Sequence, residues 1–417
     1  MSSTEMDGFV GCAVAADSIL DTTTILHGPG GCRIHMSRLS ARYLKRDFKT
    51  REGDYFFHHE RIPCTFIDRD DYIYGASKKV SMVLDLLENE DTKFATIIQS
   101  PGASLIGDKL KDEVLYKGLD YKTVVLDTSF MSEKFSVGFD TTLTKIAEKI
   151  VRPAEKEKNT VNIIGLPFTS RGYYGYLKEL TGLLESMGLK VIAAIGAGCT
   201  LDELRRSSAA EYNLCIYPEY CKEISGFYED VYGIKTIRCP EGAPIGYYAL
   251  ASFIESIGKS FGIDVSRFIA DLEHDRKIVD ITIDSSMAVG ELLNYKTFSI
   301  EGESSVIHPL MTFMIRFLKM VPQSIVITES DEEFVAKIKD LLERMGRSSA
   351  LEEEFGKGYT NILFGPGAYV KLLESQGACG IGVDINLPSR DMIDISTKSI
   401  LGLDGLHKML DDVLNSR

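Results

Sequence analysis

The sequence predicts an α/β fold made of three Rossmann-like domains, each with a mostly parallel sheet flanked by helices. The 417 residues exceed what one hydrophobic core usually holds. Short β-branched runs also alternate with longer amphipathic segments along nearly the whole chain, as in parallel sheets with helical crossovers. Charged segments at 152–160 and 272–286 interrupt this alternation. We therefore expect domains at 1–155, 156–285 and 286–417.

Nine short runs predict strands, because each is rich in β-branched residues and ends at a loop. They cover 93–100, 122–128, 160–166, 189–198, 213–217, 296–300, 324–330, 360–367 and 379–386. Residues 174–190 predict a crossover helix that stops at Gly188, because their leucines recur at helical spacing. The last segment, 405–417, has the same periodicity, and we expect its helix to dock on the last sheet.

The composition is that of a soluble globular protein, with 44% hydrophobic and 26% charged residues. The net charge of −14, with no basic stripe, disfavours nucleic acid as a partner. No apolar run reaches the length of a membrane span, and the first residues lack the features of a signal peptide. We expect a cytoplasmic protein without a membrane partner. In that reducing compartment, we expect the eight cysteines to be metal ligands or buried thiols rather than disulfides.

Two motifs that resemble nucleotide-binding loops fail on inspection. The "GKS" at 258–260 lacks the glycine that a phosphate-binding loop needs five residues earlier, where Phe253 stands. The "GAG" at 196–198 lacks the third glycine of a dinucleotide fingerprint, where Leu201 stands. We expect no nucleotide site in this chain, so any ATP that the reaction needs is handled by another polypeptide.

Three cysteines near the start of the chain suggest an iron–sulfur cluster. In "HGPGGC" (27–32) the glycines predict a tight turn before a helix, so Cys32 should lie where a helix N-terminus favours a thiolate. Cys12 follows Gly11 and is expected in a similar turn, and Cys64 follows Pro63. Any one of them alone is more often a buried core thiol. Their joint placement in small-residue turns favours cluster ligands, because backbone N–H groups then approach the sulfurs.

These segments carry a family resemblance. The order G-C (11–12), H-G-P-x-G-C (27–32) and C-T-x5-D-x-I-Y-G-A-x-K-K (64–79) resembles the N-terminal domain of the nitrogenase component 1 superfamily. That group comprises molybdenum–iron protein subunits, cofactor-assembly scaffolds and dark-operative protochlorophyllide reductases. Further segments follow in family order at 100–110, 162–165, 228–234 and 244–246, and the closing helix completes the order.

The resemblance implies that Cys12 and Cys32 are cluster ligands. Nitrogenase has a third ligand cysteine where this chain has Ser100, so the resemblance implies either Cys64 or a partner subunit as the substitute. Three thiolates from each of two subunits would suit a P-cluster-like [8Fe–7S] centre, and fewer would suit a shared [4Fe–4S] cluster.

The resemblance also indicates what the chain lacks. Tyr217 stands where the nitrogenase α subunit anchors its active-site cofactor with a cysteine, so we expect no iron–molybdenum cofactor. The remaining cysteines receive no role from the sequence; they are Cys199, Cys215, Cys221, Cys239 and Cys379.

The resemblance implies a subunit of a nitrogenase-like, ATP-dependent reductase. It would take electrons from a separate ATP-hydrolysing iron protein onto an interface cluster and pass them to a substrate. Its partner would be a paralogous component 1 subunit or a second copy of itself. Two alternatives are a scaffold for iron–sulfur or metallocofactor assembly and a doubly wound binding protein whose cysteines are structural. The substrate stays open among tetrapyrroles, carbon–sulfur compounds and small multiply bonded molecules.

Overall fold

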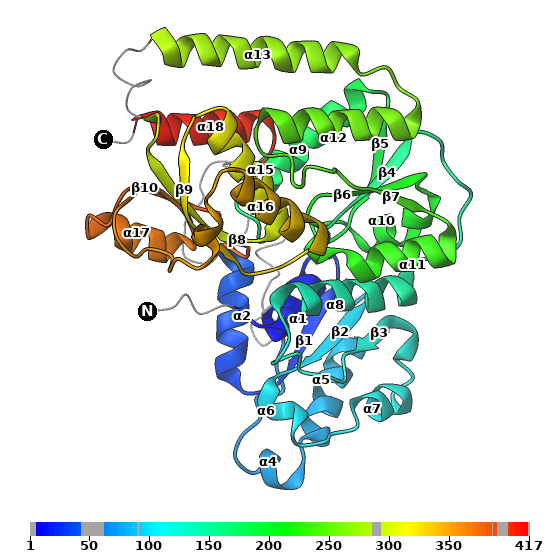
Figure 1. The fold of residues 1–417 in the computed structure, drawn as a ribbon. Coiled ribbons are helices and arrows are strands. Elements are labelled where there is room, and N and C mark those ends of the chain that lie inside the picture. The colour runs from blue at the N-terminus through cyan, green and yellow to red at the C-terminus, as the bar shows by residue number, and fades with distance from the viewer. Residues whose placement is uncertain are drawn as a thin grey trace.

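The computed structural model describes residues 6–42, 62–89, 92–285, 293–385, 387–389 and 399–415. It contains three separate sheets, and every strand pair within them is parallel. Figure 1 shows the N-terminal sheet below and the other two sheets above it. The predicted α/β architecture with three parallel sheets is therefore confirmed.

The N-terminal sheet has the strand order β1-β2-β3. Its strands are β1 (Thr23–His27), β2 (Ala95–Gln99) and β3 (Thr123–Val125). Its helices are α1 (Gly8–Asp17), α2 (Gly30–Arg42), α4 (Asp71–Tyr74), α5 (Ser77–Asn89), α6 (Pro101–Ser104), α7 (Leu110–Tyr116) and α8 (Phe135–Ile150). The sequence analysis missed β1, a strand of five residues that ends directly at the glycine-rich turn.

The middle sheet has the strand order β5-β4-β6-β7. Its strands are β4 (Thr160–Ile164), β5 (Lys190–Ala194), β6 (Tyr212–Cys215) and β7 (Lys235–Ile237), and β7 was not predicted. Its helices are α9 (Tyr173–Ser186), α10 (Leu201–Arg206), α11 (Lys222–Tyr232), α12 (Gly246–Phe261) and α13 (Ser266–Ser285). The predicted stop after α9 is confirmed, because Gly188 has a φ of +78°, which glycine adopts without strain.

The C-terminal sheet has the strand order β11-β10-β8-β9. Its strands are β8 (Thr297–Gly302), β9 (Val321–Ile327), β10 (Thr360–Gly365) and β11 (Cys379–Asp384). The helices of this part are α15 (Ser304–Arg316), α16 (Glu332–Arg344), α17 (Gly367–Ser375) and α18 (Gly402–Asn415). In both four-stranded sheets the chain adds its second strand on one side of the first and the later strands on the other. In folds with such a reversal, ligands commonly bind at the carboxyl ends of the strands.

The last helix does not dock where the sequence analysis expected. Helix α18 packs against α9 and α12 of the middle part instead of on the last sheet. Its first turn is held there because the Glu179 carboxylate on α9 accepts the Leu403 N–H at 2.6 Å, and the Gly402 N–H donates to the Pro244 carbonyl at 2.9 Å. Among the described segments, no helix has both the length and the apolar character needed to cross a bilayer.

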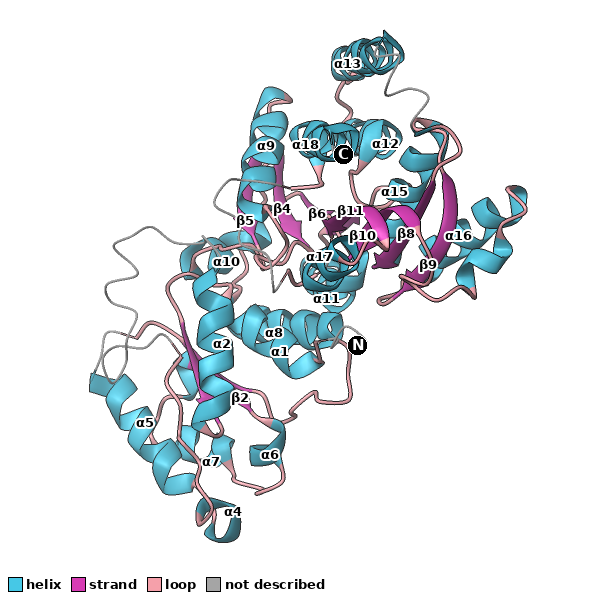
Figure 2. Cartoon of the chain, turned by 90° about the vertical axis from the view of Figure 1, so that its left-hand side faces the viewer, coloured by secondary structure: helices cyan, strands magenta, loops and turns pink. Residues whose placement is uncertain are grey.

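Helices α1 and α8 lie side by side and connect the N-terminal sheet with the middle part (Figure 2). A Cβ at Gly138 would lie 1.9 Å from the Gly8 carbonyl oxygen, and one at Gly11 would lie 2.1 Å from the Phe135 carbonyl oxygen. The two helices therefore touch backbone to backbone, which only glycine permits. Farther along α8, the Asp140 carboxylate accepts two backbone N–H groups at the start of α11.

Candidate functional site

The HGPGGC segment leads from β1 directly into α2. Cys32 lies in the first turn of α2, as predicted, and its N–H donates to the Pro29 carbonyl at 3.1 Å. A Cβ at Gly30 would press on the Phe66 ring at 3.1 Å, whereas one at Gly31 would meet nothing within 4 Å. Burial raises the pKa of the Cys32 thiol, although the side chain is only partly buried. The helix N-terminus acts in the opposite direction, because it favours the thiolate.

A buried histidine joins three segments of the family motif. Because the Asp108 carboxylate accepts at 3.2 Å, His27 Nε2 carries the proton. His27 Nδ1 then accepts from the Thr65 hydroxyl at 3.2 Å, and that hydroxyl accepts the Gly28 N–H at 3.1 Å. Burial lowers the pKa of His27, so the ring is neutral at pH 7. These bonds hold the glycine turn, the Cys64 segment and the segment before α7 in one rigid arrangement.

Cys64 lies beside β1 and faces the same turn. Its thiol donates to the Gly28 carbonyl at 3.0 Å, and its sulfur accepts the Phe66 N–H at 3.3 Å. Burial raises the pKa of Cys64, the Phe66 N–H and the charge of Arg33 lower it, and nearby Cys32 raises it. An N–H group directed at sulfur is the contact that stabilises a cluster-bound thiolate.

Ser100 flanks the turn from the other strand. Its N–H donates to the His27 carbonyl at 2.9 Å, and its hydroxyl accepts the Ala103 N–H at the start of α6. A Cβ at Gly28 would lie 2.6 Å from the Ser100 hydroxyl oxygen, so Ser100 and Cys64 both border Gly28. The structure thus brings Cys32, Cys64 and Ser100 around one loop.

Cys12 is placed differently from the expectation. It lies inside α1 rather than in a turn, because the nearby glycines serve the close contact of α1 with α8. Its thiol donates to the Gly138 carbonyl at 3.4 Å, and burial raises its pKa to about 12. The charge of Asp7, at the N-cap of α1, acts on both Cys12 and Cys32. The thiol of Cys12 is therefore turned toward α8.

The described residues of one chain do not supply enough ligands to surround a metal centre. Among the described residues, no group of three His, Cys, Asp or Glu side chains converges as metal ligands. Cys32 and Cys64 fit cluster ligation by their position, their glycine surroundings and the N–H on sulfur. The cysteines without an assigned role are all buried; they are Cys199, Cys215, Cys221, Cys239 and Cys379.

The sequence analysis missed a pocket in another part of the molecule. Glu303 and Glu329 line it; Glu303 directly follows the end of β8, and Glu329 lies two residues beyond the end of β9. A glutamate at the carboxyl end of a predicted strand is the signal that was available for Glu329 in "SIVITES" (324–330).

Comparison with known proteins finds a matching family and several similar proteins. The sequence matches the family described as nitrogenase component 1 type oxidoreductase over residues 8–416. It is 26% identical over 211 residues to one subunit of the light-independent protochlorophyllide reductase of Halorhodospira halophila, covering 46% of this chain and 39% of that protein. The corresponding subunit of Heliobacterium modesticaldum is 32% identical over 124 residues, covering 30% of this chain and 23% of that protein. These matches therefore span less than half the length of either relative.

Solved structures show the same fold. A structure titled nitrogenase Cp1 at pH 6.5 superposes with a TM-score of 0.77 at 16% identity, covering 100% of this chain and 94% of that one. A second, titled nitrogenase Cp1 at pH 5, gives a TM-score of 0.70 at 17% identity, covering 99% and 88% of the two chains.

Proposed function

Because this chain belongs to the family of nitrogenase component 1 type oxidoreductases, we propose that it is one subunit of a nitrogenase-like reductase. In this proposal it holds an iron–sulfur cluster together with a partner subunit and receives electrons from a separate ATP-hydrolysing iron protein. The observation that carries the proposal is the placement of Cys32 at the end of the glycine loop and of the Cys64 thiol against that loop, which His27 joins to the neighbouring segments.

The ligands from this chain are Cys32 and Cys64, with Cys12 as a third on the strength of the family motif. Ligation by Cys12 requires its thiol to exchange the hydrogen bond to Gly138 for the metal. A cluster held here supplies one-electron transfer at low potential. The Phe66 N–H and the charge of Arg33 stabilise the Cys64 thiolate.

The surface beside the loop supports a partner subunit. Large apolar side chains are exposed there instead of buried; they are Ile34, Phe66, Tyr72, Ile73 and Tyr74. Phe66 borders Gly30, and the Tyr72 hydroxyl borders Gly102 at the start of α6, so this patch adjoins the turn that carries Cys32. Exposed apolar side chains next to an incomplete ligand set are typical of a subunit interface. A paralogous component 1 subunit or a second copy of the chain would supply the missing ligands.

The names of the curated relatives favour one substrate class. Both are subunits of a protochlorophyllide reductase, so among the classes left open by the sequence we place a tetrapyrrole first. The cytoplasm is the compartment that this chemistry requires, because a reducing environment keeps the thiols free for iron.

Iron content after anaerobic reconstitution tests the proposal. We expect wild-type protein to bind iron and to absorb broadly in the visible range, and we expect Cys32→Ser and Cys64→Ser each to lower the iron bound per chain. Cys379→Ser is the matched control, because this buried thiol belongs to β11 of the C-terminal sheet. An iron-free wild-type protein, or equal iron in all variants, would contradict the proposal.

Metal analysis of the same samples tests the cofactor assignment. We expect no molybdenum, because the buried phenol of Tyr217 stands where the family anchors its cofactor with a thiolate. Stoichiometric molybdenum would contradict this assignment.

A further inference from the structure

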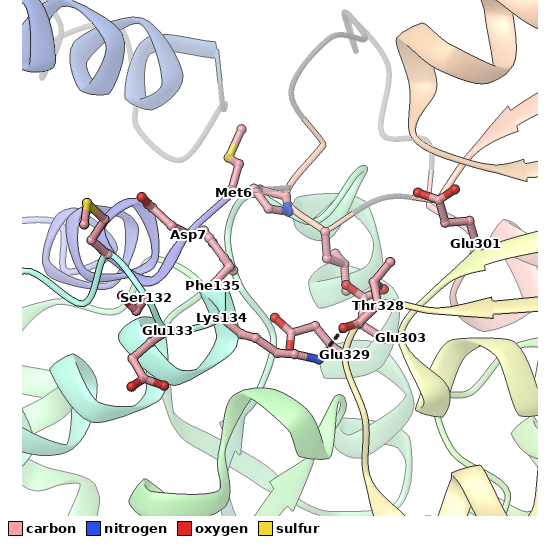
Figure 3. Close-up of a pocket in the computed structure, with 13 residues that line it drawn as sticks. Met6, Asp7, Ser132, Glu133, Lys134, Phe135, Glu301, Glu303, Thr328 and Glu329 are labelled. Atoms are coloured by element: carbon pink, nitrogen blue, oxygen red, sulfur yellow. Dashed lines mark hydrogen bonds and ion pairs between the residues drawn. The ribbon is translucent and has the colours of Figure 1, made fainter. Parts of the chain in front are cut away.

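A pocket of about 290 Å³ lies where the start of α8 and the residues just before α1 meet the carboxyl ends of β8 and β9 (Figure 3). Among the described residues, its charged lining consists of five carboxylates and one ammonium; they are Asp7, Glu133, Glu301, Glu303, Glu329 and Lys134. Phe135, Met131 and Leu387 contribute apolar surface. The lining is therefore strongly acidic but has apolar walls.

Lys134 does not neutralise the pocket. Its ammonium donates to the Thr328 carbonyl and lies 3.9 Å from a Glu329 oxygen, as Figure 3 shows. Glu329 also accepts from the Ser136 hydroxyl at 2.9 Å. Lys134, the one cation among the described lining residues, is thus held at one end of the pocket by the Thr328 carbonyl and Glu329.

Glu303 has one carboxylate oxygen without a hydrogen-bond partner among the described residues. It is 1% exposed, and its Oε1 accepts from the Tyr220 hydroxyl at 2.9 Å. Its Oε2 is buried and has no hydrogen-bond partner among the described residues. A buried oxygen without a donor is unfavourable, so it indicates a missing ligand group.

The groups around Glu303 are also predominantly acidic. Burial raises its pKa well above the usual range, and the charges of Glu219 and Glu329 add to this. Tyr217 and Tyr220 are the phenols that its charge reaches, and burial is the main cause that raises their pKa values. The carboxyl therefore holds its proton more tightly than an exposed glutamate does, and it would release that proton when a cation arrives.

We propose that this pocket binds a small alkylammonium cation whose N–H donates to Glu303 Oε2 and whose hydrocarbon part packs against Phe135 and Leu387. The volume equals about ten water molecules, so a compound of up to about ten non-hydrogen atoms fits. A bare metal ion is disfavoured, since no three ligand side chains converge among the residues described. The inference goes beyond the proposed reductase function and does not depend on the cluster.

Calorimetry on the purified full chain, without iron, tests the proposal at pH 7. The probes are 1,5-diaminopentane, the uncharged 1,5-pentanediol of similar shape, and MgCl₂. We expect the diamine to bind about tenfold or more tightly than the diol, because a hydrogen bond to a charged group is the contact that the diol lacks. Equal affinities for diamine and diol, tighter binding of Mg²⁺, or no binding of the diamine would overturn the proposal.

Two further measurements locate the site. Glu303→Gln should weaken diamine binding about tenfold, whereas Glu352→Gln, the same substitution at an exposed glutamate, should leave it unchanged. Equal loss in both variants would overturn the assignment. In the wild-type protein, binding should release a proton, measured as a difference in heat between phosphate and Tris buffers; binding without proton release would also overturn it. Because no step uses iron, this proposal and the reductase proposal fail separately.

Discussion

Replacing Gly138 with alanine tests the backbone contact between α1 and α8. The new Cβ would lie 1.9 Å from the Gly8 carbonyl oxygen, 1.5 Å short of the 3.4 Å at which ordinary contact begins. The obstacle is backbone, so it cannot turn aside as a flexible side chain would. The helices would have to separate by about that distance, and the buried contacts of Phe9, Cys12 and Phe139 between them would be loosened.

The expected cost follows from the size of this overlap. Overpacking a well-packed core lowers the free energy of unfolding by about 1–3 kcal/mol. A backbone clash of this depth lies at the upper end of that range, so we expect Gly138→Ala to lower the free energy of unfolding by about 3 kcal/mol. Gly226→Ala is the matched control, because a Cβ at this position of α11 meets nothing within 4 Å. There alanine should stabilise the helix by about 0.5–1 kcal/mol.

Urea unfolding, followed by circular dichroism and tyrosine fluorescence, measures both effects. We expect the midpoint of Gly138→Ala to fall and that of Gly226→Ala to rise slightly. Iron binding should fall with Gly138→Ala as well, because α1 carries Cys12. An unchanged midpoint for Gly138→Ala would refute the close approach of the two helices.

Three other predictions concern single side chains. Cys12→Ser should keep the melting temperature, because a hydroxyl can still donate to Gly138, but should lower bound iron; unchanged iron would remove Cys12 from the ligand set. The sulfurs of Cys215 and Cys221 lie 3.0 Å apart, so diamide should take their two hydrogens and leave a disulfide that peptide mass spectrometry detects, and none should form in Cys215→Ser. Burial raises the pKa of Asp140 from 3.8 to about 6. The folded form then holds the proton more tightly than the unfolded chain, so from about pH 4 to pH 6 the wild type should lose up to about 3 kcal/mol relative to Asp140→Asn. Parallel stability curves for the two proteins would contradict this.

Much of the fold and part of the site were predictable from the sequence. All nine predicted strands have counterparts, and Cys32 lies at the predicted helix start. These features depend on side-chain periodicity and on glycine and proline, which act within a few residues along the chain. The strands β1 and β7, of five and three residues, were not predicted.

Long-range packing decided how the predicted elements and the candidate site residues are arranged in space. The sequence alone determined most of the helices and strands and the glycine turn that leads into the helix of Cys32. Only the tertiary structure placed Cys12 against α8, joined His27 to Asp108 across 81 residues, and laid α18 on the middle part of the molecule. It also brought Glu303 and Glu329 to one pocket beside Lys134. The physical reason is that which surfaces meet depends on the complementarity of shapes from distant parts of the chain, and local periodicity contains no information about that complementarity.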